Sequence, residues 1–488
     1  MDCKLRAKNC GGCPMRATEY AAQLKKKEAD VRALLGKYGP VAPIRGMETP
    51  YHYRNKVIST FAPAAGGKLT SGIYAARTHK VLPVESCLLQ DEVLDKVMLA
   101  VRAAANACRY QPFNEDKGTG LLRHCLLRRG VATGQVMVVL VTAQPVLPGA
   151  KNFVKALLAE AEKRGVPVTT VVQNYNPRRT SVVLGEDEKV LYGKGFILDT
   201  LCGKTYALSP RSFYQVNPVQ TAVLYGLAVD AAHLTGKEVV LDAYCGIGTI
   251  GLTASDKARQ VVGVEVNRDA VRDAIGNAKH NGVKNARFFA ADATAWIREA
   301  ADAGQKADVV FMDPPREGST PAFIESVARM APKRIVYVSC NPETMARDLA
   351  LLTQKGYRAE GFTPVDMFPH SAHCETVVLL SHKKPDSYIH IDVEFGEGEG
   401  KIPVDKIVQR AEQYKPKERV TYKRIKEYIL EKYGFKVHTA YIAEVKRSLG
   451  LPMYDAPNAV EKLKQARKHP TPEKVEAIKD ALHYFAVI

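Results

Sequence analysis

Three short motifs place reactive side chains directly after apolar, strand-like stretches of the chain. Cys340 stands in Val-Ser-Cys-Asn-Pro after one such stretch, and Asp313 stands in Asp-Pro-Pro-Arg after another. A glycine-rich turn, Gly246-Ile-Gly248, follows a third. In an open α/β sheet the carboxyl ends of parallel strands meet at one edge. The order of the motifs therefore predicts a thiol, a carboxylate and a nucleotide-binding turn at a single site.

Cys340 has the sequence surroundings of a reactive thiol. Asn341 and Pro342 end the strand, and a helix predicted over 343–352 starts there, so that its N-terminal dipole would lower the thiol pKa. A free cysteine is most often packed in a core, which is the competing interpretation. As a thiolate, Cys340 could add to C6 of a pyrimidine ring and make C5 able to attack an electrophilic methyl group.

Such a reaction ends with loss of the C5 proton, and this step requires a base. Glu375 heads the last predicted strand and follows His370 and His373 closely. A carboxylate there can act as the base if it is partly desolvated. The alternative is a surface glutamate in a turn.

The glycine-rich turn has the surroundings of a nucleoside site. Asp242 precedes the turn, Glu265 ends the next strand, where an acid can bind both ribose hydroxyls, and Asp292 closes the third, near an expected adenine edge. The third glycine of the dinucleotide fingerprint is missing, so S-adenosylmethionine fits better than a dinucleotide. A nucleotide-free α/β domain is the alternative. Asp313 could contact either the base or the cofactor, although Asp-Pro-Pro also occurs as a plain turn.

Regular alternation of strands and helices positions these motifs. The predicted strands are 238–242, 260–264, 286–289, 308–312, 334–338, 357–365 and 375–381. The last two have no helix between them and should form an antiparallel pair. We therefore predict an α/β fold with a seven-stranded Rossmann-like domain over 216–383.

Three further regions flank this domain. Residues 1–40 combine clustered cysteines with a helix over 16–37, and 41–215 form an α+β module. In that module we expect strands near 53–61, 136–142, 169–172 and 180–184, and helices near 91–107 and 150–163. Residues 389–488 form a basic extension, with a strand over 389–393 and a helix-turn-helix-like pair over 420–434 and 439–449. A charged helical bundle without a binding role is an equally open interpretation of this extension.

The composition points to a cytoplasmic protein with a polyanionic partner. The formal net charge is +18, which favours nucleic acid, although many basic proteins are merely soluble. We find no membrane-length apolar run, no secretory signal and no sign of an obligate protein partner. Ten cysteines without a signal peptide indicate a metal or cluster site and a catalytic thiol, not disulfides.

Taken together, five motifs resemble the S-adenosylmethionine-dependent RNA uracil-5 methyltransferases, most closely the bacterial 23S ribosomal RNA branch. The motifs are Ser339-Cys-Asn-Pro, Asp313-Pro-Pro-Arg, His373-Cys-Glu-Thr, Ser212-Phe-Tyr-Gln-Val-Asn and Asp242-Ala-Tyr-Cys-Gly-Ile-Gly. The resemblance covers about residues 1–382 and is specific, because all five motifs occur in one order.

The resemblance implies a role for each matching residue. Cys340 would be the nucleophile and Glu375 the proton acceptor. The cofactor would be held by Gln215, Tyr244, Glu265, Asp313, Thr249 and Asp292. Cys3, Cys10, Cys13 and Cys87 would hold a [4Fe-4S] cluster, with a four-cysteine zinc site as the alternative.

The resemblance also implies that the central module faces RNA. Its cations with neighbouring aromatic residues would bind phosphates and a splayed-out base. They are Arg54, Lys56, Arg77, Arg123, His124, Arg128, Arg129, Arg178 and Arg179. The extension 389–488 lies outside the resemblance, and we expect it to help hold RNA. Transfer RNA as the substrate, methylation of a base amino group and a non-catalytic RNA-binding factor are the alternative functions.

Overall fold

The structure, a computed structural model, describes residues 3, 5, 8–178, 180, 182–382, 422–449 and 469–484. The chain divides into two compact units, Met1–Tyr388 and Ile389–Ile488. None of the described helices combines the length and apolar character that crossing a bilayer requires.

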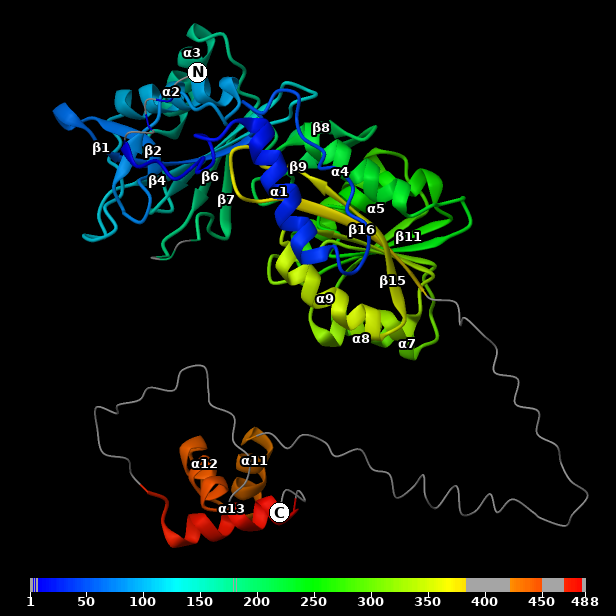
Figure 1. The fold of residues 1–488 in the computed structure, drawn as a ribbon. Coiled ribbons are helices and arrows are strands. Elements are labelled where there is room, and N and C mark those ends of the chain that lie inside the picture. The colour runs from blue at the N-terminus through cyan, green and yellow to red at the C-terminus, as the bar shows by residue number, and fades with distance from the viewer. Residues whose placement is uncertain are drawn as a thin grey trace, which may run out of the picture. The chain divides into compact units, whose positions relative to one another are not determined.

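A seven-stranded sheet forms the carboxyl-terminal part of the first unit (Figure 1). Its strands are β10 (Val239–Ala243), β11 (Gln260–Glu265), β12 (Ala286–Ala290), β13 (Val309–Met312), β14 (Arg334–Ser339), β15 (Tyr357–Val365) and β16 (Glu375–His382). The order across the sheet is β12-β11-β10-β13-β14-β16-β15, and β16 alone runs antiparallel to the other strands. The fully buried β13 shows why a continuous apolar run indicates a central parallel strand.

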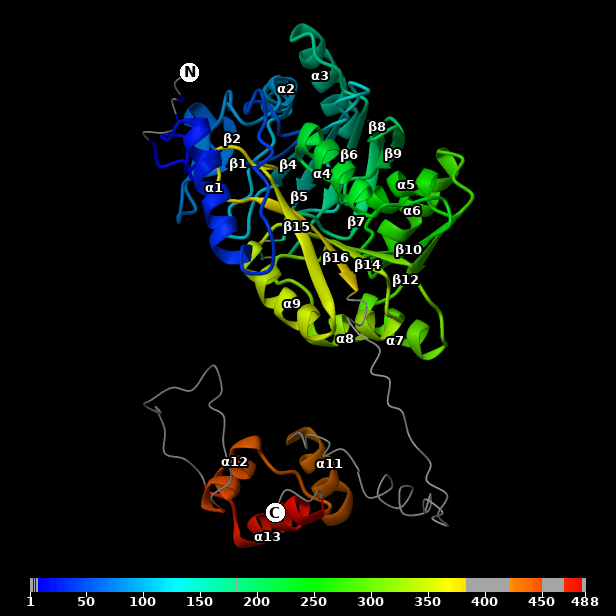
Figure 2. The same ribbon diagram turned by 45° about the vertical axis from the view of Figure 1, so that its right-hand side comes forward.

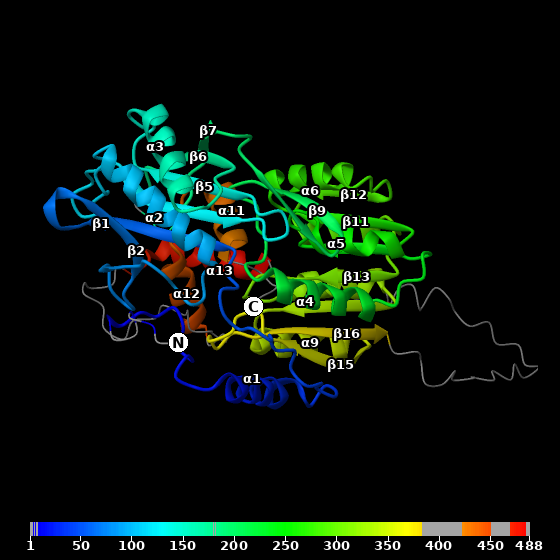
Figure 3. The same ribbon diagram turned by 90° about the horizontal axis from the view of Figure 1, so that it is seen from above.

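Helices cover both faces of this sheet (Figure 2). Side chains of α4 (Pro218–Ala231), α5 (Thr249–Ala254) and α6 (Arg268–His280) join the core of one face. Side chains of α1 (Tyr20–Leu35), α7 (Ala293–Asp302), α8 (Pro321–Met330) and α9 (Pro342–Gln354) join the core of the other. Helix α1 therefore packs against α9 and the edge strand β15, and it lies beside β15 in the view from above (Figure 3).

The amino-terminal half of this unit contains a second seven-stranded sheet, in the order β3-β2-β1-β4-β5-β6-β7. Its strands are β1 (Lys56–Pro63), β2 (Leu69–Tyr74), β3 (Val81–Pro83), β4 (Leu122–Arg129), β5 (Val136–Thr142), β6 (Thr170–Tyr175) and β7 (Asp187–Tyr192). One face packs against α2 (Glu92–Ala107) and α3 (Ala150–Lys163). The other face shares a hydrophobic core with the carboxyl-terminal sheet and its helices, because Leu126 and Val139 belong to the same buried cluster as Tyr225 of α4.

Two details of this half differ from the sequence expectations. The strand expected over 180–184 is wrong, because the described residues of that stretch are not in a strand and the strand lies at β7. The Asn176 amide donates to the carbonyls of Val182 and Val183, which keeps this apolar stretch in a loop. A hairpin of β8 (Ile197–Leu201) and β9 (Lys204–Leu208), which we did not expect, leads to α4.

The second unit contains three described helices, α11 (Tyr422–Tyr433), α12 (Thr439–Ser448) and α13 (Pro472–Tyr484). They enclose a small core of their own, with Ile429, Ile442 and Ile478 fully buried. The two helices expected near 420–434 and 439–449 are present. The strand expected over 389–393 lies outside the described residues.

Candidate active site

The proposed nucleophile and base lie on neighbouring antiparallel strands. The last registered pair between β14 and β16 is Ser339 with Thr376, so Cys340 and Glu375 come one step beyond it. Side chains directly opposite each other across an antiparallel pair have Cβ atoms about 4.5–5.5 Å apart. Two motifs separated by 35 positions of sequence thus meet at one edge of the sheet.

Two carboxyl groups, those of Glu375 and Asp313, interact at this edge. Burial raises the pKa of Glu375 to about 8, with a further contribution from Asp313, and Arg316 opposes the shift. Burial likewise raises the pKa of Asp313 to about 7. The side chain of Glu375 is 3% exposed, and no described residue donates a hydrogen bond to its carboxylate.

The expected depression of the thiol pKa at position 340 is wrong. Burial raises the pKa of Cys340 to about 11, and Glu375 and Asp313 raise it further, while Arg316 lowers it. Helix α9 does begin at Pro342, with Asn341 as its cap: the Asn341 side chain accepts from Glu343 N at 3.1 Å. Two neighbouring acids and partial burial outweigh the dipole of this helix.

The glycine-rich turn after β10 is held by two carboxylates. Asp242 is buried and accepts a hydrogen bond from Gly251 N at 2.7 Å, and a side chain at Gly251 would meet the same carboxylate oxygen at 2.7 Å. Glu265, at the end of β11, accepts from Gly246 N at 3.1 Å and from Asn267 N at 2.9 Å. Asp242 therefore fixes the turn, whereas Glu265 stands at the strand end where a ribose would bind.

Four further predicted cofactor residues lie on different segments of the domain. Tyr244 follows β10 in a left-handed backbone conformation (φ 66°), and its ring lies 5.1 Å from that of Phe323. Thr249 begins α5, and its hydroxyl lies 3.2 Å from the Tyr225 hydroxyl. Asp292 caps α7 and is exposed. Gln215 is buried in the segment between β9 and α4.

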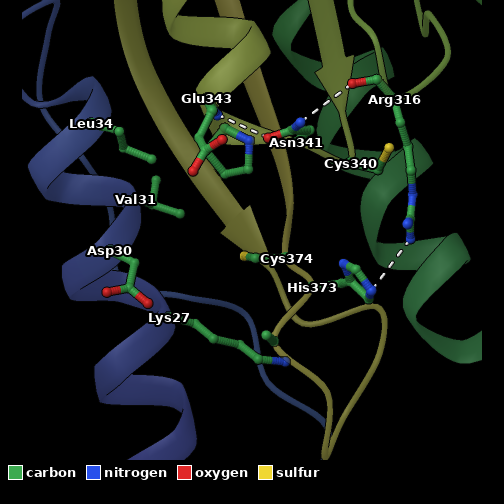
Figure 4. A pocket seen from close by; sticks show the side chains of 12 residues that line it. Lys27, Asp30, Val31, Leu34, Arg316, Cys340, Asn341, Glu343, His373 and Cys374 are labelled. Carbon is green, nitrogen blue, oxygen red and sulfur yellow. Dashed lines mark hydrogen bonds between the residues drawn. The ribbon is translucent and has the colours of Figure 1, made fainter. Parts of the chain in front are cut away.

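A cavity of about 490 Å³ opens beside Cys340. Figure 4 shows that its walls come from α1, the start of α9 and the residues just before β16. Arg316 and His373 meet across it, with Arg316 Nη2 and His373 Nε2 3.4 Å apart. Burial, Arg316 and Lys27 lower the pKa of His373, which favours a neutral ring.

Lys27, from α1, also lines this cavity, and the sequence analysis missed it. It stands in a lysine-rich helix beside Lys25 and Lys26, both of which are exposed. The only available signal was its helical spacing from Leu24 and Val31, and a lysine at such a position reads as part of the solvated face.

The four predicted cluster ligands are free thiols of intermediate burial. Burial raises the pKa of Cys13, and Cys10, Cys3 and Cys87 raise it further, so each of these three thiols lies within electrostatic reach of Cys13. Within the described ranges, no group of three or more Cys, His, Asp or Glu side chains is gathered as a metal-ligand set. An all-thiol donor set suits an iron–sulfur cluster or zinc.

Several of the cations expected to bind phosphate have other partners. Arg128 is buried and donates to the carbonyls of Ser209 and Ser212. Arg123 is buried and donates to the carbonyl of Asn176. The pKa of His124 falls to about 4 because it is buried, which leaves it neutral.

Two further arginines of this set form ion pairs within the protein: Arg129 with Asp91, and Arg178 with Glu186. In the described part of the chain, no carboxylate pairs with Arg54, Lys56 or Arg77. Of the predicted cations, these three therefore have no ion pair in the described part of the chain, and their contact with RNA stays a prediction. Arg179 lies outside the described residues.

Comparison with known proteins agrees with this geometry. A family model described as tRNA (Uracil-5-)-methyltransferase matches residues 183–383. An RNA methyltransferase of uncharacterized specificity from Halalkalibacterium halodurans is 42% identical over 380 residues, covering 77% of this chain and 82% of that protein. A similar protein from Clostridium tetani is 41% identical over 377 residues, covering 76% and 81%.

A solved structure shows the same architecture. It is the Pyrococcus abyssi tRNA (uracil-54, C5)-methyltransferase in complex with S-adenosyl-L-homocysteine, with a TM-score of 0.62 and 27% identity, covering 76% of this chain and 86% of that one. The predicted seven-stranded α/β methyltransferase fold and S-adenosylmethionine as the cofactor are thereby confirmed. The chain belongs to the family of S-adenosylmethionine-dependent RNA uracil-5 methyltransferases.

Proposed function

We propose that this enzyme methylates C5 of a uridine in 23S ribosomal RNA through a transient covalent bond to Cys340. The observation that carries the proposal is the cross-strand placement of Cys340 beside a buried, unpartnered Glu375. Neither methylation of a base amino group nor RNA binding without catalysis has a use for this pair.

The chain's own residues account for the bonds made and broken. S-adenosylmethionine supplies the electrophilic methyl group. The Cys340 thiolate forms a bond to C6 of the uracil, which puts electron density on C5 and lets C5 take the methyl. Glu375 then removes the C5 proton, the C5–C6 double bond re-forms, and the bond between C6 and the Cys340 sulfur breaks.

The electrostatics of the site fit a cationic cofactor. Burial raises the pKa values of Cys340, Asp313 and Glu375, and acidic neighbours add to the shift at Cys340 and Glu375. A positive charge beside these groups would lower all three pKa values, because it favours their ionised forms. Arg316 already acts in this direction on Cys340 and Glu375. The thiol and the base are therefore best ionised when the positively charged cofactor is bound.

Replacing Cys340 tests the covalent step. The Cys340→Ala protein should bind S-adenosyl-L-homocysteine as the wild type does and yield no 5-methyluridine in a digest of the RNA product. A methylated amino group in the wild-type digest would favour the alternative base chemistry. Robust 5-methyluridine formation by Cys340→Ala would refute the mechanism.

The choice of 23S ribosomal RNA is supported by the four cysteines, which are typical of that branch. Transfer RNA is the competing substrate, since the Pyrococcus abyssi enzyme is named for it. Mapping 5-methyluridine in ribosomal and transfer RNA from cells with and without this protein separates the two. A site lost only from transfer RNA would overturn the ribosomal assignment.

We infer further that Cys3, Cys10, Cys13 and Cys87 hold a [4Fe-4S] cluster. Their free, neighbouring thiols support this assignment, and zinc is the alternative. Iron, sulfide and zinc analysis of anaerobically purified protein decides between them. Four equivalents of iron and sulfide are expected, and stoichiometric zinc without iron would contradict the cluster. The RNA-holding role of residues 389–488 stays a prediction.

A further inference from the structure

The loop 366–374 joins β15 to β16 and leads directly into Glu375. It also carries His373, which lines the cavity beside Cys340. At the other end of the loop, Asp366 directly follows Val365, which pairs with Glu375 across β15 and β16. The two ends of the loop therefore stand beside each other, next to the proposed base.

A buried ion pair fastens the start of this loop to α1. Lys27 Nζ lies 2.5 Å from Asp366 Oδ1, and the two side chains are 2% and 0% exposed. The same ammonium donates to the Phe368 carbonyl at 3.2 Å. The hydroxyl of Tyr20, at the start of the same helix, donates to the other carboxylate oxygen of Asp366 at 2.9 Å.

The middle of the loop is held by the same amino-terminal region. Gln23 bonds His370 twice, once to the ring Nδ1 and once to the backbone N–H, both at 3.0 Å. Met15 N donates to the His370 carbonyl, and the Tyr53 hydroxyl donates to the Pro369 carbonyl. His370 has φ 67°, a left-handed conformation that a histidine keeps only when its surroundings impose it.

Stability alone does not explain why this ion pair is buried. Removing two charges from water costs several kcal/mol per ion, and well-packed apolar replacements of such pairs are often as stable or more stable. A buried pair with added hydrogen bonds does, however, favour one arrangement of its backbone over all others. In Figure 4 the Lys27 side chain extends from α1 toward the segment bearing His373 and Cys374, across the cavity from Cys340.

We propose that Lys27 and Asp366 are positioning residues that set the loop 366–374 so that Glu375 can take the C5 proton. This inference rests on the proposed covalent mechanism. It makes the amino-terminal helix part of the catalytic apparatus, although α1 contributes no group that reacts. The affected step is elimination, not formation, of the bond between Cys340 and RNA.

The test replaces the pair by apolar residues of similar volume, Lys27→Met with Asp366→Leu, so that no buried charge is left alone. We expect a folded protein whose kcat falls about 10- to 100-fold while its KM for RNA changes little, because the reacting groups are misplaced by a fraction of an ångström to an ångström. We also expect a covalent protein–RNA adduct to accumulate on denaturing gels. The single substitution Lys26→Met, on the exposed side of the same helix, should show neither effect.

RNA containing 5-fluorouridine provides the matched control. Its ring has no C5 proton to remove, so the adduct should form at the same rate in the wild type and in the double variant. A double variant with wild-type kcat and no adduct on ordinary RNA would overturn the inference, and so would a slowed adduct on 5-fluorouridine RNA. If the wild type itself forms no adduct with 5-fluorouridine RNA, the covalent mechanism fails, and not merely this inference.

Discussion

Two regions of the protein each contain a charged side chain that has hydrogen-bond partners and another that has none among the described residues. At the sheet edge of the catalytic domain, Asp242 and Glu375 both have raised pKa values because they are buried. Asp242 accepts from Gly251 N, whereas Glu375 has no hydrogen-bond donor among the described residues. In the amino-terminal sheet, Lys56 of β1 and Arg128 of β4 are directly opposite each other. Arg128 donates hydrogen bonds to the carbonyls of Ser209 and Ser212, whereas Lys56 has no partner among the described residues.

The comparison indicates how structural and functional charges differ in this protein. A buried polar group normally finds a hydrogen bond, since leaving it without one costs about 1–3 kcal/mol. Asp242 and Arg128 follow that rule and hold backbone segments in place. The side chains of Glu375 and Lys56, by contrast, have no hydrogen-bond or ion-pair partner among the described residues, and we predict that a substrate group supplies one.

The largest expected effect comes from removing the charge of Glu375. Glu375→Gln should lower kcat by about 10²- to 10⁴-fold, because the amide cannot accept the C5 proton. The protein–RNA adduct should accumulate with unmodified RNA and be visible on a denaturing gel. A variant that turns over at the wild-type rate would mean that another group is the base.

Replacing the Asp242 carboxylate by an amide, Asp242→Asn, should lower kcat much less than Glu375→Gln does. The Asn oxygen in Asp242→Asn can still accept from Gly251 N, so the glycine-rich turn should keep its shape and kcat should fall only severalfold. Asp242→Ala leaves that buried N–H unpaired and should cost about 1–3 kcal/mol in the free energy of unfolding. Urea unfolding and calorimetric binding of S-adenosyl-L-homocysteine measure both effects. Equal loss of activity in Asp242→Asn and Glu375→Gln would erase the distinction drawn between the two carboxylates.

The sequence carried most of the catalytic-domain fold because parallel, doubly covered strands are continuous apolar runs. It also placed Cys340, Asp313 and Glu265 at strand ends. The register that brings Cys340 opposite Glu375 was beyond it, because that register depends on how β16 returns beside β14 after the intervening β15, which no local pattern of residues specifies.

Long-range contacts also explain the errors in the sequence predictions. The pKa of Cys340 is raised, not lowered, because the fold partly buries the thiol and brings Glu375 and Asp313, two acids distant in sequence, close to it. Arg123 and Arg128 resemble phosphate ligands by composition, yet the fold buries them against carbonyl groups. Lys27 looks like its exposed neighbours until Asp366 is brought to it.

The raised pKa values of Glu375 and Asp242 should make the stability of the protein depend on pH. Glu375 and Asp242 have folded pKa values of about 8 and about 7, above their ordinary values of 4.5 and 3.8. Groups with raised folded pKa values stabilise the fold fully at low pH, and this contribution is lost as the pH rises through 7 and 8. The free energy of unfolding of ligand-free protein should therefore fall from pH 5 to pH 9, and fall less in Glu375→Gln. Parallel curves for the two proteins would show that Glu375 ionises normally in the fold.

The smallest effect concerns Lys56, whose pKa is lowered to about 8 by burial and by Arg128. A backbone phosphate would supply the missing counter-charge. Lys56→Met should then weaken RNA binding severalfold and reduce the slope of log affinity against log salt by about one, because one phosphate contact is lost. The matched control is Lys68→Met, which removes the same charge from an exposed position in the connection between β1 and β2. Lys56 should also contribute less above pH 8, as its ammonium loses its proton, and an unchanged salt slope together with equal effects of the two substitutions would show that Lys56 contacts no phosphate.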